Sequence, residues 1–234
     1  MTLSGAEKRF IGAAVVINTL CLGLFLLRYL ITGTPRYWFI PENILLAWLA
    51  LLSAWLLTRY LKEHKWLSWQ GLGLLLLWLA FLPNAWYVMT DFIHIEDTGE
   101  ISQLYDIALI NILVASGFLA GFTSLYLIHK QLLKRLSHWR SAVIIGLVIL
   151  AAGFAIYLGR DLRWNSWDVL ANPGGLILNT YDRLIDPFGH PRMINVTSLL
   201  FVVIGGLYLA IWQFLKPQNS TPHQPAVRRS RPHR

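Results

Sequence analysis

The sequence predicts an all-α membrane protein, a bundle of six transmembrane helices with a short interfacial helix in the last outer loop. Of its 234 residues, 56% are apolar and only 14% are charged, whereas an ordinary soluble domain carries about 25% charged residues. Six charge-free stretches of 16 to 25 residues approach the roughly 20 apolar residues that cross a bilayer. This composition excludes a soluble enzyme and a disordered regulator. The one cysteine, Cys21, lies in an apolar stretch, which excludes a disulfide-stapled secreted module.

The predicted spans follow the charge-free stretches, because backbone polar groups in lipid must pair within their own segment. The spans cover about residues 10–28, 43–60, 68–90, 106–128, 141–159 and 194–215. The first span follows Lys8 and Arg9, as the apolar region of a signal peptide would. Its apolar stretch is longer than that of a usual signal peptide and has no small-residue cleavage site, so we expect the span to be retained. The second is short, and Trp48 and Trp55 suit a helix whose ends reach the interface.

The chain is predicted to hold a single transmembrane domain, residues 1–216, followed by a disordered basic tail, residues 217–234. The tail is rich in Pro, Ser and Arg and cannot bury a core. Its expected partners are anionic phospholipids of the bilayer; a merely solvated tail is the alternative. The sequence names no protein partner.

The distribution of charge predicts the orientation of the spans. With six spans, 14 of the 20 lysines and arginines fall on the side of the two termini, and ten of the twelve acidic residues fall on the other side. Positive charge is retained on the cytoplasmic side, so we expect both termini to be cytoplasmic. The net charge of +8 then reflects orientation and the basic tail, and we expect no nucleic-acid binding.

Polar residues collect at the outer end of the third span. Pro83 lacks a backbone N–H, so the carbonyl four residues earlier loses its helical hydrogen bond. The side chain of Asn84 can donate to that carbonyl instead. In a continuous α-helix, Asn84 and Asp91 share a face, and His94 is a neighbour of Asp91. Such a helix would line a polar cavity. The alternative is that Asp91 and His94 only mark where the helix leaves the membrane.

The fourth span opens with Asp106, an ionisable residue that is costly in a membrane unless it faces water or a partner. It is therefore a candidate functional residue, although a helix N-terminus also favours a capping carboxylate. We expect the acidic residues of the preceding loop, Glu96, Asp97 and Glu100, to be solvated. Gly117 and Gly121 form a GxxxG pattern that predicts close helix packing.

The densest polar segment covers residues 159–175. If it is helical, Asp161, Asn165 and Asp168 share one face, while Arg160, Trp164 and Trp167 share another. The second strip suits an aromatic belt with arginine at the interface, and Arg163 adds a further outer charge. Residues 176–185 then read as a short interfacial amphipathic helix.

Two stretches, LPNAWYVMTDFIH at residues 82–94 and RDLRWNSWD at residues 160–168, resemble a bacterial family of multi-pass membrane proteins known as domain of unknown function 1361. The resemblance extends from about the second span to the sixth. It implies a polytopic protein of the bacterial cytoplasmic (inner) membrane and assigns no activity.

Three functions remain open. The favoured one is a non-catalytic membrane component for scaffolding, assembly or sensing, in which the outer charges neutralise one another. The second is an outer-leaflet hydrolase or transferase acting on a lipid-linked substrate. The third is a small transporter or channel, in which Asn18, Asn111 and an acidic outer mouth would serve cation passage.

The enzyme hypothesis, with or without a divalent cation, assigns catalytic and substrate-binding roles to the outer polar residues. The candidate catalytic residues are Asp91, His94, Asp106, Asp161 and Asp168. Of these, Asp91, His94 and Asp106 are also candidate ligands of a divalent cation. The candidate substrate-binding residues are Asn84, Arg160, Arg163, Trp164, Asn165 and Trp167. All three hypotheses place these side chains in one outward-facing cluster.

Overall fold

A computed structural model describes residues 5–164 and 171–215, which are all-helical with no β-strand among them. The helices are α1 (Gly5–Thr32), α2 (Phe39–Tyr60), α3 (Trp69–Tyr87), the 3₁₀ helix η1 (Val88–His94), α4 (Gln103–Leu133), α5 (His138–Asp161), α7 (Pro173–Ile185) and α8 (Pro191–Leu215). Six segments, α3 with η1 counted as one, are long and apolar enough to cross a membrane. The predicted fold class is therefore confirmed.

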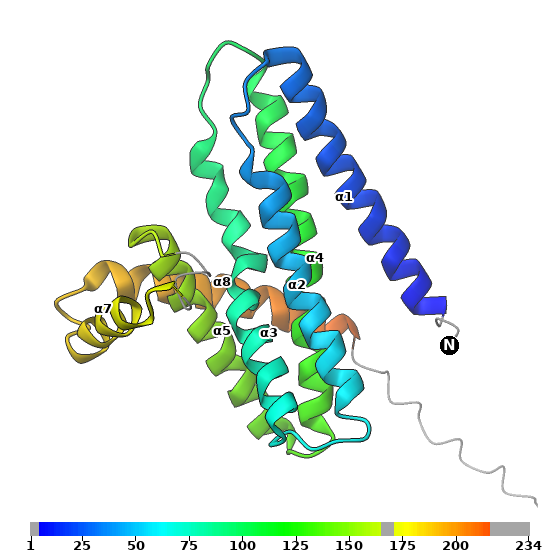
Figure 1. Cartoon of the computed structure of the whole chain (residues 1–234), viewed down its shortest axis with the longest axis vertical. Helices are drawn as coiled ribbons and strands as arrows, with labels where there is room; N and C mark the ends of the chain where they lie inside the picture. Colours follow the sequence, from blue (N-terminus) through cyan, green and yellow to red (C-terminus); the bar gives the residue numbers. More distant parts are fainter. Residues whose placement is uncertain (1–4, 165–170, 216–234) are drawn as a thin grey trace, which may run out of the picture.

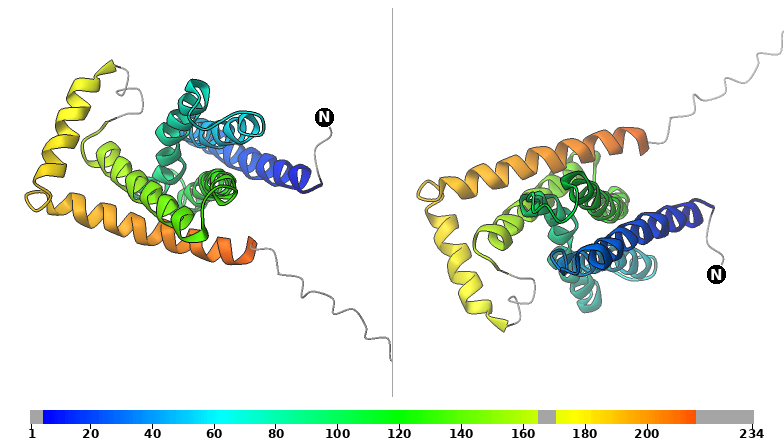
Figure 2. Two further views of the ribbon diagram at one scale, coloured as in Figure 1. Left: turned by 90° about the horizontal axis from the view of Figure 1, so that it is seen from below. Right: turned by 90° about the horizontal axis from the view of Figure 1, so that it is seen from above.

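Helices α2, α3 and α4 form the centre of the bundle (Figure 1). Helix α1 lies against α4, and α8 packs against α5. Seen along the long axis, α2 and α4 are nearly end-on while α8 is seen lengthwise, so α8 crosses the bundle obliquely (Figure 2). Trp78, Trp86, Leu125 and Ile156 are among the buried residues at the centre.

The GxxxG pattern of α4 meets α3, as predicted. A Cβ atom added to Gly117 would collide with the backbone oxygen of Ala85, and one added to Gly121 would lie 2.8 Å from Nε1 of Trp86. Only residues without a side chain allow two helices to approach this closely. The glycines thus fix the separation of α3 and α4.

Most helices are longer than the predicted spans. The predicted spans stop near the first polar or charged residues, whereas the helices continue into these residues. Helix α4 begins at Gln103 and ends at Leu133, several residues outside the predicted 106–128. The hydroxyl of Ser137 caps α5 by accepting from the amide of Arg140 at 3.4 Å. Serine at an N-cap satisfies an amide that has no partner inside the helix.

The third span changes helix type at its outer end. Helix α3 continues through Pro83 to Tyr87, and residues Val88–His94 then form a 3₁₀ helix. A 3₁₀ helix has three residues per turn rather than 3.6, so the α-helical spacing that was expected to align Asn84 with Asp91 no longer applies. Asp91 is buried, whereas His94 is exposed.

The fifth span ends earlier than a helical reading of residues 159–175 requires. Helix α5 stops at Asp161, and Arg163 adopts a left-handed backbone with φ 58°. Of the predicted strip of Asp161, Asn165 and Asp168, only Asp161 belongs to the described part of α5. Asn165, Trp167 and Asp168 lie outside the described residues.

The helix expected at residues 176–185 is present as α7, which begins a few residues earlier at Pro173. The side chain of Asn172 caps it by accepting from the amide of Gly175 at 3.1 Å. Its exposed apolar residues include Ile177, Leu178 and Tyr181. Helix α7 lies at the edge of the bundle between α5 and α8 (Figures 1 and 2).

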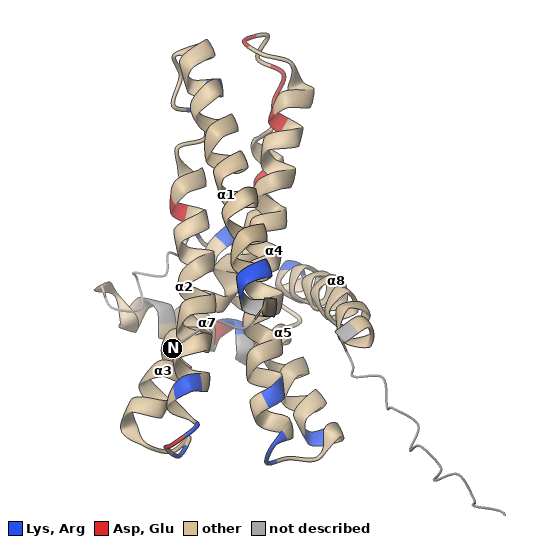
Figure 3. Ribbon diagram, turned by 90° about the vertical axis from the view of Figure 1, so that its right-hand side faces the viewer, with Lys and Arg blue, Asp and Glu red and all other residues tan. Residues whose placement is uncertain are grey.

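The two ends of the bundle differ in charge (Figure 3). Lysine and arginine gather on the connections of residues 61–68 and 134–137 at one end, and acidic residues gather on the connection of residues 95–102 at the other. Below, these are called the basic end and the acidic end.

Candidate functional site

An ion pair between α1 and α4 is the most deeply buried charged contact among the described residues. Nε of Arg28 donates to Oδ1 of Asp106 at 2.7 Å, and Nη2 donates to Oδ2 at 3.2 Å. Both side chains are only 2% exposed. Two parallel charge-assisted bonds fix the orientation of both groups as well as binding them. Asp106 is therefore neutralised by Arg28.

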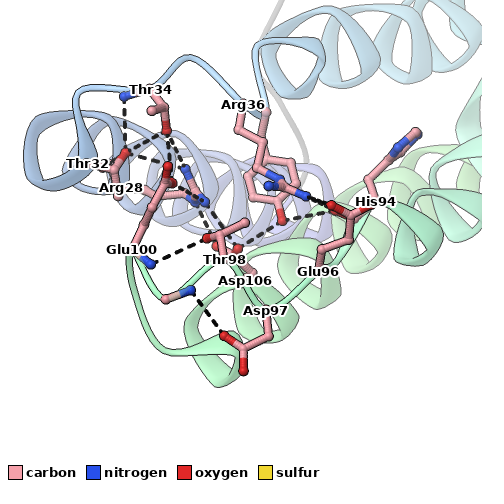
Figure 4. Close-up of polar contacts among 12 residues, drawn as sticks. Arg28, Thr32, Thr34, Arg36, His94, Glu96, Asp97, Thr98, Glu100 and Asp106 are labelled. Atoms are coloured by element: carbon pink, nitrogen blue, oxygen red, sulfur yellow. Dashed lines mark hydrogen bonds and ion pairs between the residues drawn. The ribbon is translucent and has the colours of Figure 1, made fainter.

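The connection between α1 and α2 completes this cluster (Figure 4). The hydroxyl of Tyr37 donates to Oδ2 of Asp106 at 2.9 Å, and the Arg28 guanidinium lies over the Tyr37 ring, 4.7 Å from its centre. Burial, together with the hydrogen bond to Asp106, raises the pKa of Tyr37 to about 12, so its hydroxyl stays protonated and remains a donor. Thr32 and Thr34 accept from Nη1 of Arg28 at 3.5 and 3.4 Å.

Two loop carboxylates that were expected to be solvated join this end of the molecule. Oε2 of Glu100 lies 3.7 Å from Nη2 of Arg28 and accepts from the hydroxyl of Thr34 at 3.2 Å. Glu96 accepts from Nη2 of Arg36 at 2.7 Å. Both remain partly or largely exposed. We call Arg28, Tyr37, Glu100 and Asp106 the Arg28 cluster.

Asp91 lies in a second cluster, between α2, η1 and α5. Its side chain is buried, with 2% of the residue exposed, and Oδ2 accepts from Nδ2 of Asn43 at 2.9 Å. Arg160, in the last turn of α5, is a neighbouring cation that forms no ion pair with Asp91 or His94 among the described residues. We call Asn43, Asp91 and Arg160 the Asp91 cluster.

Two residues that were expected to line a cavity with Asp91, namely His94 and Asn84, make contacts with other residues. The His94 ring points away from the Arg28 cluster (Figure 4) and lies 5.4 Å from the ring of Phe39. The amide of Asn84 donates to the carbonyl of Phe81, 3.3 Å away on its own helix. Only the backbone carbonyl of His94 reaches the Arg28 cluster, where it lies 3.4 Å from the Tyr37 hydroxyl.

A third polar contact ties the end of α5 to α8. Asp161 pairs with Nη2 of Arg192, while Arg163 is exposed and Trp164 is half-buried. Among the described residues, the predicted outer site residues thus take part in three contacts with different partners. Within residues 5–164 and 171–215, no three His, Cys, Asp or Glu side chains lie close enough together to hold a metal ion, so Asp91, His94 and Asp106 do not form one ligand set.

Sequence reasoning missed Arg28, Tyr37 and Asn43. Arg28 was counted only as one of the outer positive charges, although it ends an apolar stretch just as Asp106 begins one. Two opposite charges at equal depth on different spans are expected to pair, since each is costly alone in a membrane. That rule could have predicted that Asp106 pairs with an outer arginine. It could not have selected Arg28 of α1 from the other outer arginines.

Cavities between the helices lie away from these clusters. One of about 470 Å³ lies between α1, α4 and α8, and includes Ile17, Phe118 and Ile211. Another of about 610 Å³ lies between α4, α5 and α8, and includes His129 and Trp212. Neither is lined by aspartate, glutamate, lysine or arginine.

Comparison with known proteins supplies a family and no activity. No curated protein and no solved structure matches the chain. A family model described as a protein of unknown function (DUF1361) matches residues 42–211. The match contains Asp91, Asp106 and Arg160 but excludes Arg28 and Tyr37. Because it covers well over half of the sequence and agrees with the resemblance found there, the chain belongs to the DUF1361 family of proteins of unknown function.

Proposed function

We propose that this protein is a non-catalytic component of a bacterial cytoplasmic membrane, acting in scaffolding, assembly or sensing, with both termini in the cytoplasm. In this role the outer polar residues hold helix ends together. They do not transform a substrate.

The Arg28–Asp106 ion pair carries this proposal. Asp106 is a buried candidate catalytic carboxylate, yet both its oxygens accept from Arg28, and Tyr37 adds a third bond. A general base needs a free oxygen within reach of the proton it removes. A carboxylate engaged in this way is suited to joining α1 to α4.

A second candidate function rests on the Asp91 cluster. Asp91 is buried beside the amide of Asn43 and the charge of Arg160, and His94 is exposed on the same 3₁₀ helix. Arginine binds phosphate well, and His94 could exchange a proton with a lipid headgroup. These residues support an outer-leaflet hydrolase or transferase on a lipid-linked substrate as the alternative, with or without a divalent cation.

A genetic experiment separates the two functions. A strain that lacks the protein is complemented with the wild type, with Asp91→Asn or with Asp97→Asn, a control in the exposed loop, and its lipids and metals are profiled. For a non-catalytic component we expect all strains to share one lipid profile. The proposal fails if a lipid accumulates in the deletion strain and Asp91→Asn, present in the membrane at the wild-type level, does not clear it.

A further inference from the structure

The cavity between α4, α5 and α8 has the size and lining of a ligand site. Its volume of about 610 Å³ lies in the range of roughly 300–1,000 Å³ typical of small-molecule sites. Apolar residues form its walls, including Ile145 and Ile149 of α5 and Phe201 and Leu209 of α8. We call this cavity the α5–α8 cleft.

Two glycines hold the cleft open. Gly146 of α5 and Gly205 of α8 both line it, and a Cβ atom added to either would have no neighbour within 4 Å. These positions therefore do not serve close helix packing, unlike Gly117 and Gly121. A side chain added at either position would thus enter open space.

The cleft also contains a buried polar group. His129 is 5% exposed, its Nδ1 lies 2.9 Å from the Tyr208 hydroxyl, and its ring stacks on Trp212 with centres 4.1 Å apart. When the Tyr208 hydroxyl donates to Nδ1, Nε2 carries the ring proton. The contact with Tyr208 uses Nδ1 and leaves Nε2 as the ring nitrogen that could donate to an oxygen of a ligand.

Two basic residues precede the part of α5 that lines the cleft. His138, which lines the cleft, directly follows the connection of residues 134–137, where Lys134 and Arg135 are exposed. The outer surfaces of α5 and α8 near the cleft are apolar, with Leu147 60% and Val202 66% exposed. A ligand that reaches the cleft from this side therefore comes from the bilayer, and its polar part meets positive charge.

We propose that the α5–α8 cleft binds an anionic glycerophospholipid. One acyl chain lies along the glycines and the apolar walls, ester or phosphate oxygens accept from His129, and the headgroup faces Lys134 and Arg135. Burial of the chain supplies most of the affinity, and the basic residues select an anionic headgroup over a zwitterionic one.

Native mass spectrometry of the delipidated full chain in detergent tests the site, with phosphatidylglycerol and phosphatidylcholine as probes. We expect the wild type to retain phosphatidylglycerol in preference to phosphatidylcholine. Gly205→Leu fills the cleft and should weaken phosphatidylglycerol binding by about tenfold. Gly206→Leu is the matched control, because Gly206 is equally open but does not line the cleft. Gly146→Leu tests the opposite wall should Gly205→Leu unfold.

The headgroup preference has its own pair of variants. Lys134→Gln with Arg135→Gln should reduce the ratio of phosphatidylglycerol to phosphatidylcholine bound. Lys62→Gln with Lys65→Gln, which removes equal charge from the other connection at the basic end, should leave the ratio unchanged. Equal binding of the two lipids by the wild type would overturn the proposal, as would equal binding of phosphatidylglycerol by the variants at positions 205 and 206.

Discussion

Arg28 and Asp106 illustrate why single charges matter so much in an apolar chain. Each side chain is 2% exposed, so neither is solvated by water once the helices pack. A buried pair gains little net free energy over an apolar pair, but removal of one partner leaves an uncompensated charge. The pair therefore fixes where α1 packs against α4, and it adds little to the free energy of unfolding compared with an apolar pair.

Substitution of one partner tests this view. Arg28→Ala should lower the free energy of unfolding by about 3–5 kcal/mol, because Asp106 is then buried with no cation. Arg28→Met combined with Asp106→Leu should recover most of that loss. Thermal unfolding in detergent, followed by tryptophan fluorescence, measures both.

A matched control for this experiment is Arg36→Ala. Arg36 pairs with Glu96 at 2.7 Å, but their side chains are 26% and 71% exposed. Such exposed pairs contribute about 0–1 kcal/mol. An Arg28→Ala protein as stable as Arg36→Ala would show that the buried ion pair does not hold α1.

At the scale of elements, contact between α3 and α4 depends on glycine. Gly117 and Gly121 face Ala85 and Trp86 closely enough that any side chain would displace backbone or indole atoms. Polar contacts then attach α1, whose surface faces largely outward. The hydroxyl of Ser116 donates to Asn18 at 2.7 Å, and the hydroxyl of Tyr105 donates to the carbonyl of Leu24 at 2.7 Å.

Alanine substitution separates packing from helix propensity. Gly117→Ala should destabilise the protein by about 1–3 kcal/mol, because the added methyl group meets the backbone of α3. Gly73→Ala is the control, since its Cβ meets no atom within 4 Å and it should gain about 0.5–1 kcal/mol from helix propensity. If both substitutions change the melting temperature in the same direction, the α3–α4 contact is looser than described.

At the scale of the whole molecule, the separation of charge predicts an orientation. The connection of residues 95–102 at the acidic end contributes Glu100 to the Arg28 cluster, and basic residues gather at the other end (Figure 3). Cysteine labelling in intact cells can test this, because the native Cys21 is fully buried and gives little background. Membrane-impermeant maleimide should label Thr98→Cys from outside and should label Glu63→Cys only after lysis. The reverse pattern would invert the proposed topology.

The sequence by itself determined the number of spanning helices, because each charge-free stretch is long enough to cross lipid and has no other way to satisfy its backbone. It also determined the glycine face of α4 and the helix that became α7, since local spacing and composition specify both. Asp106 was singled out because an ionisable residue at the start of a span is costly without water or a partner.

Only the tertiary structure decided which charges meet. Arg28 and Asp106 are 78 residues apart in the chain, and several outer arginines offered the same charge, so pairing depended on which helices pack together. The change from α to 3₁₀ helix after Tyr87 altered the placement of Asp91, and α5 ended at Asp161. Helical spacing assumes a continuous helix, and it fails at helix ends, where contacts with other segments set the backbone.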